Sequence, residues 1–355
     1  MRHATLPLDT YTSKHHPNHV GVTSADIAER AGVSRATVSY VLNDNPRQSI
    51  SPATRATVLQ AARDLGYRPN VAAQALRSGR GRAVVFPLPG LGHTHIVTQL
   101  IGACQSALDD FGLALVADHT AYESVDAQLD AWLKHSPAAV IDLLLPHGDP
   151  VLPALRSRGI QVLSSAMDTD AGWESTSDAL ARECRLTQIT HLLDRGATDI
   201  AIVVPPILPT DPRTQRAFLA QVRRLAKQRG ARVRLARVRL DSTAVSLLVD
   251  RWVADPGPRP DAVAAHNDDY AIAVQSALLA HGVRVPDDVQ VMGVDDIPLA
   301  RAVTPSLTSI TADFAPYGRA VAAAVMNSLA KRSNSTPLPL PSHHLVVRSS
   351  TRSES

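Results

Sequence analysis

The stretch ADIAERAGVSRATVSYVLND, residues 25–44, contains two short segments in which apolar residues recur at helical spacing, separated by one glycine. Thr23 precedes it with Asp26 three residues further on, the spacing of a capping box, which predicts a helix that runs to about Ala31. Gly32 is free to take the left-handed conformation that commonly ends a helix. The stretch therefore predicts one short helix followed by a tight turn.

A second helix is expected directly after this turn, with Ser34 as its cap. Its apolar residues fall at i, i+3 and i+4, so they share one face: Val38, Val41 and Leu42. Burying that face turns the opposite, polar face outward, where it is free to enter a DNA major groove. The outward face consists of Arg35, Ala36, Ser39, Tyr40 and Asn43. The two helices together predict a helix-turn-helix.

A third helix is expected to support these two. Ser51 caps it, Pro52 takes its first position, and Gly66 followed by Pro69 ends it. Its inward residues are Val58, Ala62 and Leu65. The alternative interpretation of this segment is a three-helix bundle that binds no ligand.

The positive charge of the chain is concentrated near these helices. Residues 21–82 hold nine Arg and four Asp or Glu, whereas residues 83–355 hold 25 basic and 28 acidic side chains. A basic module on a mildly acidic body suggests a polyanion partner, because phosphate binding is driven by counterion release. A solvated charged surface would explain the same asymmetry.

From residue 83 onward, short β-rich runs alternate with helical runs, and the series repeats after residue 178. Such alternation predicts parallel sheets covered by helices on both faces, and two series predict two lobes. In open parallel sheets, ligands bind beyond the carboxyl ends of the strands, so the expected pocket lies between the lobes. The fold class is thus an all-α helix-turn-helix head followed by an α/β two-lobed effector domain like that of periplasmic binding proteins.

Several classes of function are disfavoured by composition. No apolar run is long enough to span a bilayer, and the N-terminus lacks the apolar core of an export signal, so we expect a cytoplasmic protein without membrane partners. Cys104 and Cys184 are far apart and suit buried thiols better than a disulfide. His15, His16 and His19 lack supporting ligands, so no metal site is expected.

Catalysis is also disfavoured. The carboxylate pairs Asp268–Asp269 and Asp295–Asp296 each follow a strand or start a helix, and no nucleophile and base constellation accompanies them. We therefore expect no enzyme and no cofactor.

Residues 23–80 resemble the DNA-binding head and hinge of the LacI/GalR transcription regulators. The resemblance rests on the ordered motifs AGVS, TVS, VLN and TR..V..AA..LGY.PN, followed by the hinge. It continues more weakly through AHNDDYAIAVQSALLAHGVRVPDDVQVMGVDDIPLARAVTPSLTSI, residues 265–310, and through LPSHHLVVRSST. It implies a regulator, in the family's common mode a repressor, that binds a palindromic operator as a homodimer. A small-molecule effector, a sugar or another metabolite, would release or recruit it.

The resemblance also implies residue roles in DNA binding. Arg35 and Ala36 match the positions that read base edges, and an arginine can donate two parallel hydrogen bonds to guanine. Tyr40 departs from the family's arginine and either contacts the groove edge or packs. Leu76 matches the hinge leucine that wedges into the minor groove, and its alternative role is that of an ordinary buried leucine at the start of the body. The full set of expected DNA contacts is Thr23, Ser34, Arg35, Ala36, Thr37, Ser39, Tyr40, Asn43, Arg55, Asn70, Gln74 and Leu76.

Effector contacts are expected where the strands of the body end. Asp268 matches the family's pocket carboxylate, although a helix N-cap is an alternative role for it. Sugar stacking has few aromatic candidates, chiefly Trp173 and Phe218. The expected set is His93, His95, Trp173, Arg213, Arg216 and Asp268. Because Thr214 stands where many members place a ligand-binding arginine, a regulator with a degenerate pocket remains an alternative; a solute-binding protein of the same fold is a second.

These patterns predict the following boundaries: a polar tail over 1–20, the helix-turn-helix domain over 21–66, a hinge over 67–81 and the effector and dimerisation core over 82–350. Within the core, the expected N-terminal lobe covers 82–181 and 298–330, and the expected C-terminal lobe covers 182–297 and 338–350.

Overall fold

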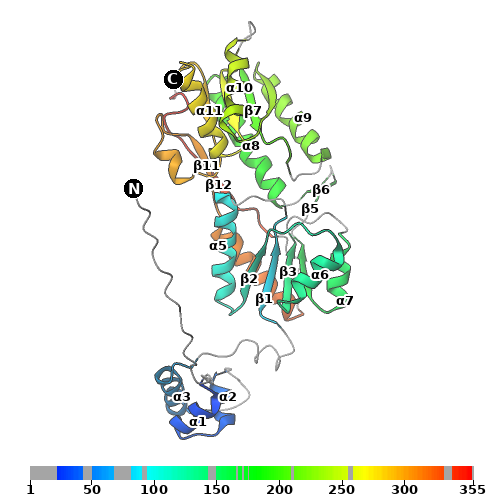
Figure 1. The fold of residues 1–355 in the computed structure, drawn as a ribbon, viewed down its shortest axis with the longest axis vertical. Helices are drawn as coiled ribbons and strands as arrows, with labels where there is room; N and C mark the ends of the chain where they lie inside the picture. The colour runs from blue at the N-terminus through cyan, green and yellow to red at the C-terminus, as the bar shows by residue number, and fades with distance from the viewer. Residues whose placement is uncertain are drawn as a thin grey trace, which may run out of the picture. The chain divides into compact units, whose positions relative to one another are not determined.

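The computed structural model divides the chain into two compact units, Met1–Ser78 and Gly79–Ser355 (Figure 1). No helix among the described residues is long and apolar enough to cross a membrane. The described residues are 22–42, 50–67, 81–89, 94–142, 149–164, 167–169, 172–174, 176–208, 212–254, 259–331 and 338–353.

The described part of the first unit, the head, contains α1 (Ser24–Ala31), α2 (Arg35–Leu42) and α3 (Pro52–Asp64). Both halves of the predicted capping box form between Thr23 and Asp26, and Gly32 adopts a left-handed φ of 66°. The predicted apolar stripes meet in one core, whose fully buried members are Ile27, Val38 and Val58. The sequence prediction of the helix-turn-helix is confirmed.

The first lobe of the second unit is built on a parallel four-stranded sheet in the order β2-β1-β3-β4. Its strands are β1 (Ala83–Pro87), β2 (Ala114–Asp118), β3 (Pro137–Asp142) and β4 (Gln161–Ser164). Val84 and Phe86 pack against α5 (His95–Asp109) and α12 (Ala315–Leu329), whereas Val85 packs against α6 (Val125–Leu133) and α7 (Val151–Ser157). Successive residues of β1 therefore serve two cores, one on each face of the sheet.

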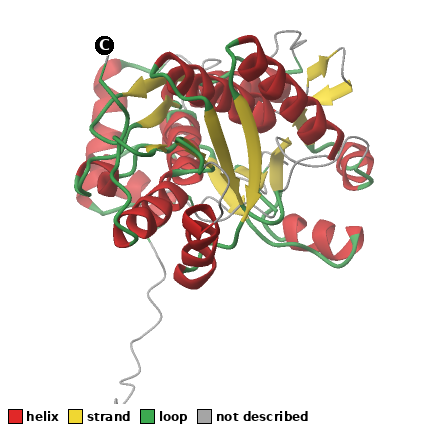
Figure 2. Ribbon diagram, turned by 90° about the horizontal axis from the view of Figure 1, so that it is seen from above, coloured by secondary structure: helices red, strands yellow, loops and turns green. Residues whose placement is uncertain are grey.

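The second lobe repeats this arrangement with the parallel order β10-β9-β7-β8. Its strands are β7 (Asp199–Val204), β8 (Arg232–Arg237), β9 (Ala262–Ala265) and β10 (Gln290–Met292). Ile200 and Ile202 contact the core under α8 (Thr176–Asp194) and α9 (Pro212–Gln228), while Ala201 and Val203 face α10 (Ser242–Ala254) and α11 (Asp268–Ala280). Figure 2 shows the helices surrounding the strands. The predicted two-lobed α/β body is confirmed.

The chain passes between the lobes through two small antiparallel pairs, β5 (Met167–Thr169) with β6 (Gly172–Glu174) and β11 (Ser309–Asp313) with β12 (Ser342–Val346). The segment from η1 (Pro298–Arg301) to β11 differs from the expected boundary. We expected residues 298–330 in the N-terminal lobe, but Ala300 and Leu307 pack into the second lobe's core. The return to the first lobe therefore follows β11 and leads into α12.

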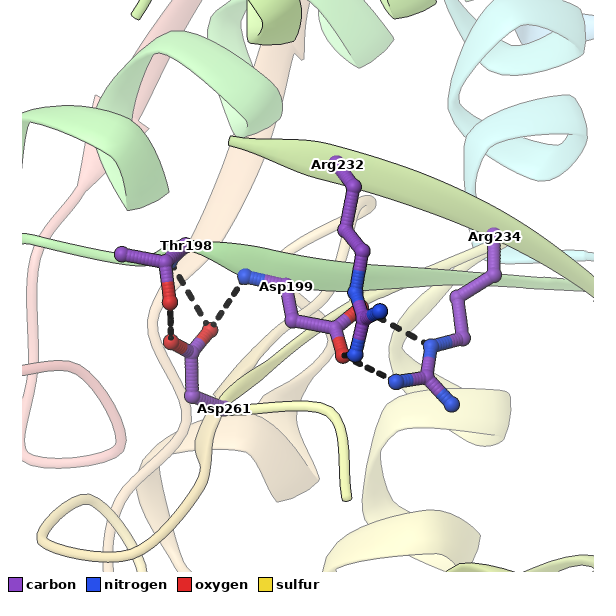
Figure 3. A network of polar contacts seen from close by, with 5 residues as sticks. All are labelled: Thr198, Asp199, Arg232, Arg234 and Asp261. Carbon is purple, nitrogen blue, oxygen red and sulfur yellow. Dashed lines mark hydrogen bonds and ion pairs between the residues drawn. The ribbon is translucent and has the colours of Figure 1, made fainter. Parts of the chain in front are cut away.

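At the amino end of the second sheet, one polar network joins three strands (Figure 3). Asp199 accepts hydrogen bonds from Arg232, at 2.6 Å, and from Arg234, both on β8. Asp261, just before β9, accepts from the backbone N–H groups of Thr198 and Asp199 at 2.9 and 3.0 Å. Although burial acts to raise the pKa of Asp199, the arginine hydrogen bonds hold that pKa below its ordinary value. The network fixes the ends of these strands on the side away from their carboxyl edge.

Candidate DNA-reading helix and effector-binding edge

The start of α2 presents an outward face, as the apolar pattern predicted. Arg35 and Ala36 are exposed, whereas Val38 and Val41 of the same helix are buried in the head core. The buried valines hold the helix against the head core while Arg35 stays exposed. Ser39 and Tyr40 are half-buried beside this face. Asn43 lies outside the described residues.

Hydroxyl groups cap the helices that carry this face. Ser34 Oγ accepts a hydrogen bond of 3.1 Å from the N–H of Thr37, and the two hydroxyls lie 2.9 Å apart. Thr23 Oγ1 accepts from Ala25 and donates to Asp26 at 2.8 Å. Ser34 is exposed and Thr23 and Thr37 are half-buried, so these caps lie at the surface of the head.

The other expected DNA contacts lie on α3 and in the hinge. Ser51 Oγ accepts from the N–H of Thr54 at 3.1 Å, which confirms the predicted cap of α3. Arg55 is half-buried in the first turns of this helix. Asn70, Gln74 and Leu76 lie outside the described residues.

The expected effector residues that the structure describes share one position in the fold. His95 begins α5 after β1, Arg213 and Arg216 lie in the first turns of α9 after β7, and Asp268 begins α11 after β9. Each therefore follows a strand at the carboxyl edge of its sheet, where open α/β folds bind ligands. The nitrogen Nε2 of His95 lies 2.8 Å from the side-chain amide of Gln99, and both arginines are exposed.

Asp268 has a different environment from the one expected. The N-cap of α11 is Asn267, which accepts from the N–H of Tyr270, so the alternative role of Asp268 as the cap was wrong. Asp268 is fully buried, and its two oxygens accept from Ser309 Oγ at 2.5 Å and from the N–H of Ile297 at 2.8 Å. Burial raises the pKa of Asp268 to about 7. Its carboxyl group holds the segments after β10 together.

Of the two aromatic candidates for sugar stacking, the structure describes the side chain of one, Phe218. Phe218 is half-buried and packs against the core of the second lobe, so its ring takes part in packing. Trp173 lies in β6, but its side chain is outside the described part of the structure, as is all of His93.

The structure adds two polar residues at the carboxyl edge of the second sheet that the sequence analysis did not select, Arg185 and His266. It also places there Asp295, which the sequence analysis considered only as part of a carboxylate pair. Arg185 and Asp295 are buried, and His266 is half-buried directly after β9. Arg185 is the one Arg, Lys, Asp or Glu in residues 184–193 of α8, a signal that the sequence does contain, although its burial does not follow from the sequence.

A pocket of about 290 Å³ lies near the carboxyl end of β8. Its apolar wall comes mainly from α10, including Leu247 and Leu248, and its rim carries Arg237, Arg239 and Arg251. None of the expected effector residues lines this pocket.

The arrangement of a helix-turn-helix and a two-lobed body matches two family models. Residues 23–70 match "Bacterial regulatory proteins, lacI family", and residues 189–351 match "Periplasmic binding protein-like domain". The chain carries the DNA-binding head of the lacI family of bacterial regulatory proteins. It is thus a DNA-binding transcriptional regulator, and the members of this family are regulators rather than enzymes.

Curated relatives extend the similarity over most of the chain, and a solved structure shows the same fold. The regulator CelR of Thermobifida fusca is 28% identical over 91% of this chain and 96% of its own length. The lactose operon repressor of Escherichia coli strain K12 is 28% identical over 84% of this chain and 82% of its own. The crystal structure of the Lac repressor dimer bound to operator and the anti-inducer ONPF has a TM-score of 0.70 at 23% identity, covering 94% of this chain and 99% of that one.

Proposed function

We propose that the protein is a transcriptional repressor that binds a two-fold symmetric operator as a homodimer and changes its operator affinity when a small molecule binds to its body. The observation that carries this proposal is the exposed start of α2, where Arg35 and Ala36 face outward while Val38 and Val41 anchor the helix. A helix held in this way places its N-terminal side chains against base edges in a major groove.

Dimerisation follows from the size of the head. One short head offers few phosphate contacts, and two heads on one duplex roughly double the electrostatic term of binding. A two-fold symmetric dimer reads a palindromic site whose half-sites match its two heads. The Lac repressor, similar in fold, is named as a dimer on its operator.

The proposed DNA contacts divide by chemistry. Arg35 donates to a guanine edge and Ala36 contacts a neighbouring base. The cap hydroxyls of Ser34 and Thr37, together with Arg55, hold phosphates. From the sequence alone, Leu76 is the hinge wedge that opens a base step in the minor groove.

The proposed effector site is the carboxyl edges of the two sheets, with His95, Arg213, Arg216 and Asp268 as candidate contacts. Ligand-driven movement between the lobes would shift the heads of a dimer relative to each other. A regulator without an effector is the second candidate. It is favoured by Asp268, both of whose oxygens are already bonded within the chain.

Selection of bound duplexes from a random DNA library by the full-length protein tests the DNA-binding proposal, and sedimentation of the protein on the selected duplex gives its stoichiometry. We expect an inverted repeat bound by two chains. Selection without a sequence preference, or one chain per selected site, would refute it. Deletion of the gene for this protein distinguishes a repressor from an activator, because the loss of a repressor raises expression of the target genes.

A further inference from the structure

Arg185, in the middle of α8, is a charged residue placed among neutral acceptors. It is only 8% exposed. Its Nη1 donates to the carbonyl oxygens of Ala264 at 3.2 Å and Ala265 at 2.8 Å, and to Oε1 of Gln188 at 2.6 Å. These carbonyls end β9, so the guanidinium lies at the carboxyl edge of the second sheet.

No carboxylate of the described residues forms an ion pair with this guanidinium, and Nε and Nη2 bond to none of those residues. Burial lowers the pKa of Arg185 to about 10, so the side chain still carries its charge at neutral pH. A buried charge without a counterion is costly, because neutral dipoles replace the lost hydration only in part.

Holding these carbonyl groups in place does not by itself require a charged side chain. One turn further along α8, the neutral amide of Gln188 donates to the carbonyl oxygens of Ala265, Met292 and Gly293 at 3.1, 3.3 and 2.9 Å. Carbonyl oxygens are thus already bound here by an uncharged donor. What a guanidinium adds over an amide is a fixed positive charge and a planar set of donors that suits carboxylate or phosphate.

The surroundings leave this positive charge uncancelled. His266 directly follows β9 and is half-buried, and burial and then the nearby Arg185 charge lower the pKa of His266 to about 4, so its ring is neutral at pH 7. Asp295 follows β10, and burial together with Asp268 and Asp269 raises the pKa of Asp295 to about 8. Burial also raises the pKa of the neighbouring Cys184 thiol to about 12, so Cys184, His266 and Asp295 do not supply the missing negative charge at pH 7.

We propose that Arg185 receives the anionic group, a carboxylate or a phosphate, of a small-molecule effector at the carboxyl ends of β9 and β10. His266 lies beside that group and supplies a neutral ring nitrogen for hydrogen bonding. This inference deepens the proposed function, since it specifies the chemical class of the effector, and it rests on there being an effector. A neutral sugar would leave the guanidinium as unpaired as it is in the free protein.

Calorimetric titration of the full-length protein with matched probes tests this assignment. The probes are glucuronate against glucose, galacturonate against galactose, and glucose 6-phosphate and inorganic phosphate as phosphate carriers. We expect at least one anion to bind while its neutral counterpart does not. Whichever class of probe binds more tightly, carboxylate or phosphate, identifies the anionic group of the effector.

Three variants locate the binding. Arg185→Gln keeps a neutral donor for the carbonyls and is expected to weaken the anion by about 10- to 100-fold. Arg185→Lys, which keeps the charge without the planar fork, should retain an intermediate affinity. Arg223→Gln removes an equal charge from an exposed position on α9 and should leave the affinity unchanged.

The inference is overturned if no anion in the panel binds the wild type more tightly than Arg185→Gln, or if a neutral hexose binds as tightly as its uronate. Far-ultraviolet circular dichroism of the variants without ligand establishes that they are folded. Operator selection is measured separately: specific DNA binding without an Arg185-dependent anion site leaves the regulator proposal standing and removes only this inference. An Arg185-dependent anion site without specific DNA binding would remove the regulator proposal and leave the anion site standing.

Discussion

Ser309 donates a hydrogen bond of 2.5 Å from Oγ to Oδ1 of Asp268, which joins the start of β11 to the first turn of α11. The same hydroxyl accepts from the N–H of Asp296 at 3.1 Å. Gly293 makes room for the carboxyl group, because a Cβ there would lie 2.0 Å from Oδ1. The chain that leaves β10 and later returns as β11 is thus tied to α11 through one buried carboxyl group.

Ser309→Ala should lower the free energy of unfolding by about 1–3 kcal/mol, because it leaves buried polar groups without their partner. Chemical denaturation of the full chain measures this change. Ser306→Ala is the matched control: its hydroxyl makes only a long 3.3 Å contact with Ser349 at the surface. An equal, small effect of both substitutions would contradict a structural role for the Ser309 bond.

Asp295→Asn should flatten the pH dependence of stability. Burial, with Asp268 and Asp269, raises the pKa of Asp295 to about 8 in the folded protein, against about 4 in an unfolded chain. Between these values the folded state keeps a proton that the unfolded state loses, so stability falls as pH rises from about 4 to about 8. Asparagine cannot ionise and tolerates the positive φ of 109° found here.

Urea denaturation of wild type and Asp295→Asn at pH 5, 7 and 8.5 checks this prediction. The variant should gain stability relative to wild type as pH rises, while part of the slope persists through Asp268. Parallel curves for the two proteins would show that Asp295 is ionised in the folded state.

Asp199→Asn should destabilise the second lobe at neutral pH by about 2–3 kcal/mol, since hydrogen bonds to charged groups contribute more than neutral ones. The arginine bonds hold the pKa of Asp199 below its ordinary value, so this stabilisation is present above about pH 4 and is lost as pH falls through the lowered pKa. The difference between wild type and variant should therefore shrink in acid. Asp130→Asn, at an exposed position on α6, is the control for removing a charge.

Gly318→Ala and Gly102→Ala should change stability in opposite directions. A Cβ at Gly318 of α12 would lie 2.4 Å from the carbonyl oxygen of Ala103, so the two helices must separate, at a cost of about 1–3 kcal/mol. A Cβ at Gly102 of α5 meets nothing within 4 Å and should add up to about 1 kcal/mol of helix propensity. Thermal unfolding of both variants tests the close approach of α5 and α12.

Local patterns predicted many elements of this fold because strands such as β1 and β7 are short apolar runs, and helices such as α1 and α3 carry their own caps. They did not predict which lobe takes residues 298–310, since Ala300 and Leu307 are placed by packing against strands far away in sequence. They offered Asp268 as a cap of α11, whereas the hydrogen bond from the N–H of Tyr270 assigns the cap to Asn267. Arg185 escaped selection because its burial depends on which face of α8 the sheet covers.

Arg35→Ala should reduce discrimination between the selected operator and a variant with a changed base pair by about 1–3 kcal/mol, the value of one bidentate contact to guanine. Because Arg35 is exposed and Val38 and Val41 keep the helix anchored, the head should unfold at an unchanged temperature. Arg55→Ala, by contrast, should weaken operator and random DNA alike and reduce the salt dependence of binding. Competition binding at two salt concentrations separates these cases. An equal loss on both DNAs for Arg35→Ala would assign it to the phosphates and leave base reading to other residues of α2.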